Sequence, residues 1–149
     1  MKVVSDFAQR FNVQVRFDKR LLVTRENRFF LVNQDVKRFL PVDFYCAGTY
    51  LGKVKGNRFF PSFELLALLA KQGAYSVTVN CKAAWLFICG RDVFESGILS
   101  TRGKPSRSGY VLVLNEYGEC LGFGRFSRSA NGVVVKNISD VGDFLRRER

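Results

Sequence analysis

Residues 110–126 read YVLVLNEYGECLGFGRF, two largely apolar stretches on either side of a polar loop. Asn115 to Gly118 has the composition of a hairpin loop and would join strand 111–114 to strand 121–124. Apolar residues occupy both parities of Val111 to Leu114, and again of Val133 to Val135, so both faces of these strands should be covered. The stretch therefore predicts a small β-barrel with further structure packed against its outside.

The segments around this hairpin extend the prediction to a mixed barrel over residues 75–149. Strands are expected at 75–79, 93–94, 110–114, 120–126 and 133–135. A short helix is expected at 82–88, ended by Gly90, and Ser139 with Asp140 would cap a last helix over 141–147.

Residues 1–74 predict a small α/β unit. Ser5 is expected to cap a helix that ends near Asn12. Asn33 is expected to cap a second, short helix that ends before Pro41. Strands are expected at 13–17, 21–24, 28–32, 44–46, 50–55 and 58–60.

The clearest helix follows its cap, Ser62, and ends at Gly73. Its leucines cover more than one face, which predicts burial between two layers. A boundary at Gly73–Ala74 would divide the chain into an N-terminal α/β domain, 1–74, and a C-terminal barrel domain, 75–149. The fold class expected from this order of elements is α+β.

Charge and composition narrow the function. The chain has 149 residues with 24 Lys and Arg against 13 Asp and Glu, a formal net charge of +11, and no histidine. Without an imidazole, Ser/His/Asp and Cys/His nucleophile pairs and His-ligated metal sites are excluded. The excess of positive charge predicts a polyanionic partner, with RNA, DNA and acidic lipid as the choices.

The cysteines and the apolar runs indicate the redox state of the thiols and whether the chain spans a membrane. Cys46, Cys81, Cys89 and Cys120 form no CxxC pair, so we expect reduced core residues and no metal site, with a disulfide as the alternative. No apolar run approaches the roughly 18 residues of a membrane span, and the N-terminus lacks the apolar stretch of a secretion signal. We therefore expect a cytoplasmic protein with no membrane partner and no cofactor.

Several short motifs carry a resemblance to a known domain. Residues 79–90, VNCKAAWLFICG, followed by Val93 and by Ser96-Gly97-Ile98, resemble the opening of a PUA RNA-binding domain. The segment LGFG at 121–124 adds to this resemblance.

Two further stretches make the resemblance narrower. These stretches are GTYLGK at 48–53 and Phe59 to Leu69. With them, the chain resembles the Nip-seven family of large-subunit ribosome biogenesis over roughly residues 20–147, and it fits an archaeal member of that family. This resemblance implies a non-enzymatic RNA-binding factor. It would contact single-stranded segments of pre-rRNA through the PUA-like barrel and other ribosome assembly proteins through the N-terminal domain.

The basic residues of the barrel are the candidate RNA contacts. We expect Arg125, Arg128 and Lys136 to line one phosphate track. The full set of candidates is Arg125, Arg128, Lys136, Arg146 and Arg147, with Lys82 and Arg91, which flank the first barrel helix, as second choices. Trp85 is a candidate for stacking on an RNA base, but we expect it instead to pack in the core or to seal the contact between the two units.

Two other functions stay open at this point. The chain could be an RNA-binding accessory domain of an RNA-modification system, or a protein-binding adaptor whose charge serves solubility. An enzyme would need a catalytic Asp or Cys within a recognisable motif of residues 1–74, and we identify none there.

Overall fold

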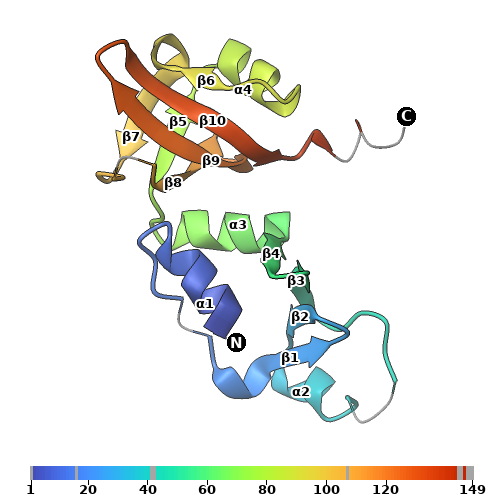
Figure 1. Ribbon diagram of the computed structural model, residues 1–149. Helices are drawn as coiled ribbons and strands as arrows, with labels where there is room; N and C mark the ends of the chain where they lie inside the picture. Colours follow the sequence, from blue (N-terminus) through green and yellow to red (C-terminus); the bar gives the residue numbers. More distant parts are fainter. Residues whose placement is uncertain (1, 16, 41–42, 107, 144–145, 147–149) are drawn as a thin grey trace.

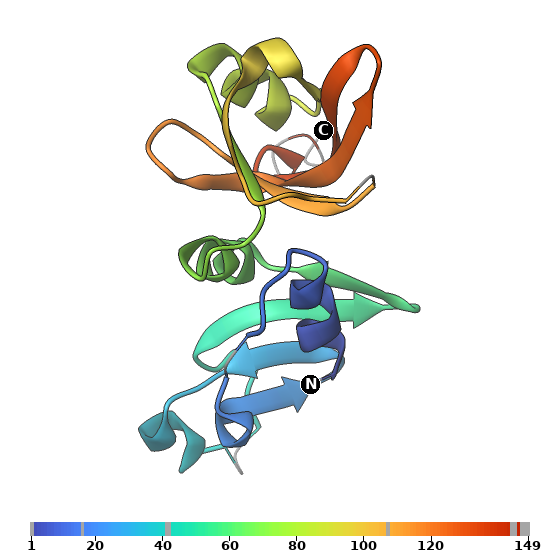
Figure 2. The ribbon, with the colours of Figure 1, turned by 90° about the vertical axis from the view of Figure 1, so that its left-hand side faces the viewer.

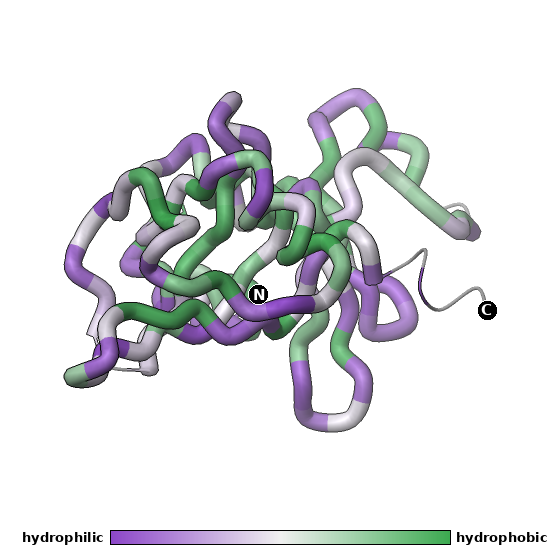
Figure 3. Tube along the Cα trace, turned by 90° about the horizontal axis from the view of Figure 1, so that it is seen from above, coloured by the Kyte–Doolittle hydropathy of each residue, from purple (hydrophilic) through white to green (hydrophobic). Residues whose placement is uncertain are grey.

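The computed structural model describes residues 2–15, 17–40, 43–106, 108–143 and 146 (Figure 1). A four-stranded and a six-stranded sheet lie one above the other, with helix α3 between them (Figures 1 and 2). Hydrophilic segments gather at the hairpin tips and outer loops, and apolar segments lie in the strands and helices between them (Figure 3). The α+β fold class is therefore confirmed.

The N-terminal unit is an antiparallel sheet, ordered β1-β2-β3-β4, with three α-helices. Its elements are α1 (Lys2–Gln9), β1 (Leu22–Arg25), β2 (Arg28–Leu31), α2 (Gln34–Lys37), β3 (Thr49–Lys55), β4 (Arg58–Pro61) and α3 (Phe63–Lys71), with a 3₁₀ turn at Lys19–Leu21. Glu26 and Asn27 both take positive φ, 46° and 63°, which is the backbone of a tight hairpin turn between β1 and β2.

The helix caps predicted for the N-terminal unit are confirmed at two of three positions. The Asn33 side chain accepts a hydrogen bond from the Val36 N–H at 2.8 Å, and Ser62 Oγ accepts one from the Leu65 N–H at 3.1 Å. Ser5 is not a cap, because α1 begins at Lys2 and Ser5 lies inside it. The apolar stripe of this helix already begins at Val4, so burial of that stripe sets where the helix starts.

Two predicted strands of this unit are absent from the described residues. Residues 13–15 and 17 form no strand, and Val13 and Phe17 pack against the core instead. Residues 44–46 form a loop, because Phe44 and Tyr45 lie under the guanidinium groups of β1 and β2 and do not join a ladder.

The C-terminal unit is a six-stranded sheet, ordered β6-β10-β9-β8-β5-β7, with one parallel pair, β5 and β8. Its elements are β5 (Ser76–Val79), α4 (Cys81–Ile88), β6 (Val93–Phe94), β7 (Ile98–Arg102), β8 (Tyr110–Leu114), β9 (Cys120–Ser129) and β10 (Gly132–Asp140). The sheet curls around α4 as a half-barrel, whose edges are β6 and β7 (Figure 2). The predicted hairpin is confirmed: Asn115 Oδ1 accepts hydrogen bonds from the N–H groups of Tyr117 and Glu119.

The two faces of the half-barrel belong to different cores. On the inner face, Val111, Val113 and Phe126 pack with Phe87 of α4. On the outer face, Leu112 and Phe123 pack with α1 and α3 of the N-terminal unit. The prediction that both faces of strand 111–114 are covered is therefore confirmed, as is the burial of α3 between two layers.

The chain after β10 agrees with its prediction only in part. Ser139 and Asp140 complete β10, and Asp143 and Arg146 after them are helical. Residues 144, 145 and 147 of the helix predicted over 141–147 lie outside the described residues. The Asp140 carboxylate is buried and accepts hydrogen bonds from the Gly142 N–H and from the Arg146 guanidinium, the latter at 3.0 and 2.8 Å.

The cysteines are free thiols, but three of them are not in the core. Cys46, Cys81 and Cys89 are exposed, and only Cys120 is partly buried, so the prediction of core cysteines is wrong for three of the four. Burial raises the pKa of the Cys120 thiol to about 11.

We expect iodoacetamide at about pH 8 to alkylate the three exposed cysteines of the native protein and to spare Cys120, because a raised pKa leaves almost no thiolate there. Mass spectrometry of the labelled peptides checks this. Alkylation of Cys120 at the rate of Cys46 would contradict it, and denaturant should make all four react alike.

Candidate nucleic-acid interface

Two of the predicted RNA contacts lie side by side on the outer face of the half-barrel. Arg125 of β9 and Lys136 of β10 are directly opposed in the antiparallel ladder, so their side chains leave the same face. Both are exposed, and in the described part of the chain neither forms an ion pair. This pair presents two unneutralised positive charges next to the N-terminal unit.

Arg128 does not join this pair. It lies three positions after Arg125, and since strand side chains alternate, it leaves the other face of β9. Its guanidinium carbon is 5.9 Å from the ring centre of Phe126, an inner-face residue. The single track predicted for Arg125, Arg128 and Lys136 is therefore split between two faces.

Arg146 is held by the protein itself. Its guanidinium pairs with the buried carboxylate of Asp140 and donates a hydrogen bond to the Ile88 carbonyl at the end of α4. The hydrogen bonds with Asp140 raise the pKa of Arg146 above its ordinary value. Its main role is thus to fasten the segment after β10 to α4, while Arg147 lies outside the described residues.

The second candidates flank α4 at a distance from the first pair. Lys82 lies in the first turn of α4, where Asn80 caps the helix through the Ala83 N–H at 2.8 Å, and Arg91 follows its last turn. Both are exposed. Trp85 on the same helix is 64% exposed, so the expectation that it packs in the core or between the units is wrong.

The structure also brings Arg125 together with two residues, Arg10 and Tyr110, that the sequence analysis had not singled out. Arg10, just after α1, donates a weak hydrogen bond of 3.4 Å to the hydroxyl of Tyr110 on β8. The guanidinium carbons of Arg10 and Arg125 lie 5.4 and 6.0 Å from the centre of the Tyr110 ring. The contact between Arg10 and Tyr110 joins residues 100 positions apart, for which a single sequence holds no local signal.

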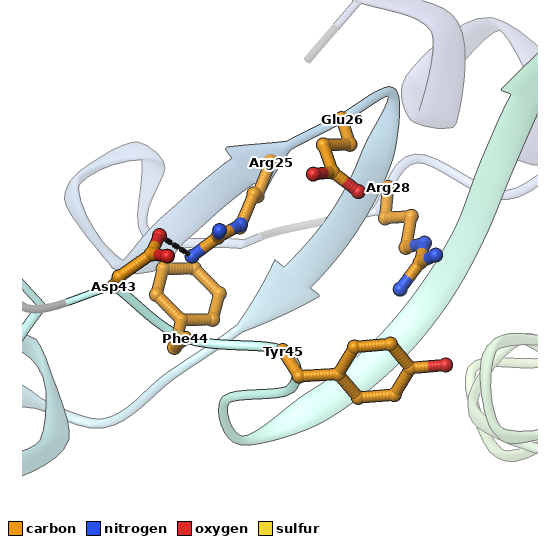
Figure 4. Close-up of a pocket in the computed structure, with 6 residues that line it drawn as sticks. All are labelled: Arg25, Glu26, Arg28, Asp43, Phe44 and Tyr45. Carbon is orange, nitrogen blue, oxygen red and sulfur yellow. Dashed lines mark ion pairs between the residues drawn. The ribbon is translucent and has the colours of Figure 1, made fainter.

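A second cluster of arginines and aromatic rings lies in the N-terminal unit (Figure 4). Arg25 forms an ion pair with Asp43 and stacks on Phe44, with its guanidinium carbon 5.2 Å from the ring centre. Arg28 stacks on Tyr45 at 4.9 Å. The hydrogen bond from Arg25 holds the pKa of the Asp43 carboxyl below its usual value. These contacts fasten the loop 43–46 to the sheet and leave Tyr45 largely exposed.

No helix in the described part of the chain is long and apolar enough to cross a membrane. Within the same residues, no three Cys, Asp or Glu side chains gather as they would around a metal ion.

A curled mixed sheet, one parallel strand pair and a helix on the inner face define a PUA-like domain. Residues 75–149 match the family described as UPF0113 PUA domain, and the chain belongs to that family. PUA domains generally bind RNA and are typically not catalytic on their own.

Two archaeal relatives support this assignment. The chain is 32% identical over 113 residues to a UPF0113 protein of Archaeoglobus fulgidus, covering 70% of this chain and 64% of the relative. It is 32% identical over 106 residues to a UPF0113 protein of Aeropyrum pernix, with coverages of 69% and 58%. The chain thus spans less than two thirds of the length of each of these curated relatives.

Two solved structures share the fold at 18% identity. One is a conserved PUA domain protein from Thermoplasma acidophilum, with a TM-score of 0.61. The other is a hypothetical protein from Pyrococcus horikoshii, with a TM-score of 0.57. Each similarity covers 99% of this chain and 92% of the other.

Proposed function

We propose that this protein is a non-enzymatic RNA-binding factor in assembly of the large ribosomal subunit. It contacts single-stranded segments of pre-rRNA through the C-terminal domain, 75–149, and other assembly proteins through the N-terminal domain, 1–74. The observation that carries the proposal is the pair Arg125 and Lys136, which stand together on an exposed face with no carboxylate partner among the described residues.

Physical reasons favour RNA as the partner of this pair. Lysine and arginine neutralise phosphates and release counterions, which gives a salt-sensitive affinity. Lys82 and Arg91 add positive charge on the α4 side of the same domain, where the exposed Trp85 offers a ring on which an unpaired base could stack.

Exposed aromatic residues support a protein contact through the N-terminal domain. Phe39, just after α2, is 74% exposed, and Tyr45 is 82% exposed in the loop that Arg28 holds. Large aromatic residues that stay in solvent are typical of interaction surfaces.

We expect the full chain to bind a fluorescein-labelled oligouridylate of about 12 nucleotides with an affinity that falls steeply as salt rises. Four phosphate contacts, from Arg125, Lys136, Lys82 and Arg91, would give a slope of log K against log salt of about −3, at roughly 0.7 per contact on a single strand, and any further contact makes the slope steeper. Fluorescence anisotropy at several salt concentrations measures it. Absence of binding at low salt, or a flat salt dependence, would contradict the RNA-binding proposal and favour a protein-binding adaptor.

The ribosomal assignment needs a separate measurement in cells. Ultraviolet crosslinking of the protein to RNA, followed by sequencing, should enrich precursor sequences of the large-subunit rRNA. Enrichment of transfer RNA instead would favour the role of an accessory domain in RNA modification.

A further inference from the structure

A cleft runs between the two units on the outer face of the half-barrel. Its volume is about 300 Å³, and its walls include Arg10, Asn57 and Arg58 from the N-terminal unit and Tyr110, Phe123 and Ile138 from the C-terminal unit. Asn57 and Arg58 belong to the β3–β4 hairpin, which extends below the C-terminal sheet (Figure 2). We call this space the inter-unit cleft.

Tyr110 holds two cations at the rim of the inter-unit cleft. Arg10 from one unit and Arg125 from the other both lie within 6.0 Å of its ring centre, and Arg10 also contacts its hydroxyl. An aromatic ring attracts a guanidinium through its electron-rich face, so one side chain fixes two positive charges that would otherwise repel each other. Tyr110 is therefore a positioning residue for both arginines.

The positive charge of the cleft is not neutralised by the described residues. None of Arg10, Arg58 and Arg125 forms an ion pair with a described carboxylate. Asp6 is the acidic residue of the cleft walls and lies one helical turn before Arg10 without pairing to it. Two guanidiniums in the cleft walls, Arg10 and Arg58, and a third beside the Tyr110 ring, Arg125, thus stand against one carboxylate, and an anion would relieve this excess of positive charge.

A second hollow continues from the first. Its volume is about 550 Å³, and it shares Arg10 and Tyr110 with the inter-unit cleft while adding Tyr75, Lys104 and Ser106. Arg58, Arg10 and Lys104 thus line two adjoining hollows, and Arg125 lies beside them against the Tyr110 ring. An extended row of cations fits a chain of phosphates better than a single small anion.

We propose that a single strand of RNA passes between the two units, with its phosphates on Arg10, Arg58 and Arg125. This assignment rests on the proposed RNA-binding function and locates part of its site outside the C-terminal domain. Guanidinium groups bind phosphate oxygens in a bidentate manner, and those held on a ring lose little conformational freedom on binding. The N-terminal unit then contributes directly to RNA affinity.

The test uses full-length variants and the labelled oligouridylate. Arg10→Gln and Arg58→Gln should each weaken binding about 5- to 10-fold at low salt and make the salt slope shallower by about 0.7. The matched control is Arg38→Gln, which removes the same charge from the same unit just after α2, far from the cleft (Figure 1). It should change the affinity less than about twofold.

Tyr110 provides a variant that keeps every charge. Tyr110→Leu should weaken binding about 3- to 5-fold, because the two guanidiniums lose their shared ring. Tyr110→Phe retains the ring and should bind like the wild type. Thermal melting of each variant separates lost contacts from lost structure.

Two outcomes overturn the inference in distinguishable ways. If the wild type binds the oligouridylate while Arg10→Gln and Arg58→Gln behave like Arg38→Gln, RNA does not enter the cleft and the proposed function stands. If the wild type does not bind the oligouridylate at low salt, this result contradicts both the RNA path between the units and the proposed RNA-binding function.

Discussion

Replacing Phe123 by alanine is expected to lower the free energy of unfolding by about 3–5 kcal/mol, the range for truncating a buried aromatic side chain. Phe123 is 4% exposed and lies where the two units meet. Its ring centre is 5.6 Å from that of Phe7, 5.8 Å from that of Phe11 and 5.5 Å from that of Tyr110. The truncation opens a cavity lined by both units, so it should destabilise both together.

Denaturant unfolding followed by circular dichroism gives the free energy, and hydrogen exchange of amides in β3 and β9 reports on each unit. Exchange should quicken in both strands of the Phe123→Ala variant. Tyr117→Ala is the control, since Tyr117 is 87% exposed in the β8–β9 loop and should cost less than about 0.5 kcal/mol. A loss below about 1 kcal/mol, or faster exchange in β9 alone, would show that the units are energetically independent.

The shared core bears on how the protein should be studied. A fragment of residues 75–149 would expose Leu112 and Phe123, which α1 and α3 cover in the full chain. The proposed boundary after Ala74 therefore divides the sequence into two units, but in the structure these units bury a shared apolar surface against each other. Binding experiments on the full chain avoid this exposed face.

The elements that were predictable from sequence are those with local chemical signals. Ser62 and Gly73 mark the two ends of α3. The Ser62 side chain caps the first turn, and Gly73 adopts a φ of 83°, a conformation that favours glycine after the end of a helix. The loop at 115–118 likewise contains its own hydrogen-bonding side chain, Asn115. The apolar residues on both faces of β8 predicted that both faces are buried, and the structure places Leu112 in one core and Val111 and Val113 in the other.

The elements that could not be predicted depend on distant contacts. β7 is an exposed polar edge strand, so it lacks the alternation that identifies a half-buried strand. Phe44 and Tyr45 look like strand residues, yet stacking under Arg25 and Arg28 places them in a loop. The helix start before Ser5 is likewise fixed by packing against the sheets.

The candidate site divides in the same way. Arg125 and Arg128 are three positions apart, and the period of two in a strand is sufficient to place them on opposite faces. The pairing of Arg125 with Lys136 requires the register of β9 and β10, which depends on the whole sheet. The meeting of Arg10 with Tyr110 requires the docking of the two units.

Replacing both Arg125 and Lys136 by glutamine is expected to weaken binding of the single-stranded oligouridylate about 100-fold at low salt. Each loses a charged contact to phosphate of about 1.4 kcal/mol, and the salt slope should become shallower by about 1.4. Both side chains are exposed and form no ion pair with a described residue, so the fold should survive, which thermal melting checks.

Arg128→Gln should have little effect on its own, because its side chain leaves the opposite face of β9. The double variant Lys82→Gln with Arg91→Gln removes the same charge near α4 and should weaken binding less. If that variant loses more affinity than the Arg125 and Lys136 pair, the main phosphate contacts lie on the α4 side of the half-barrel, and the outer face is not the principal RNA-binding surface.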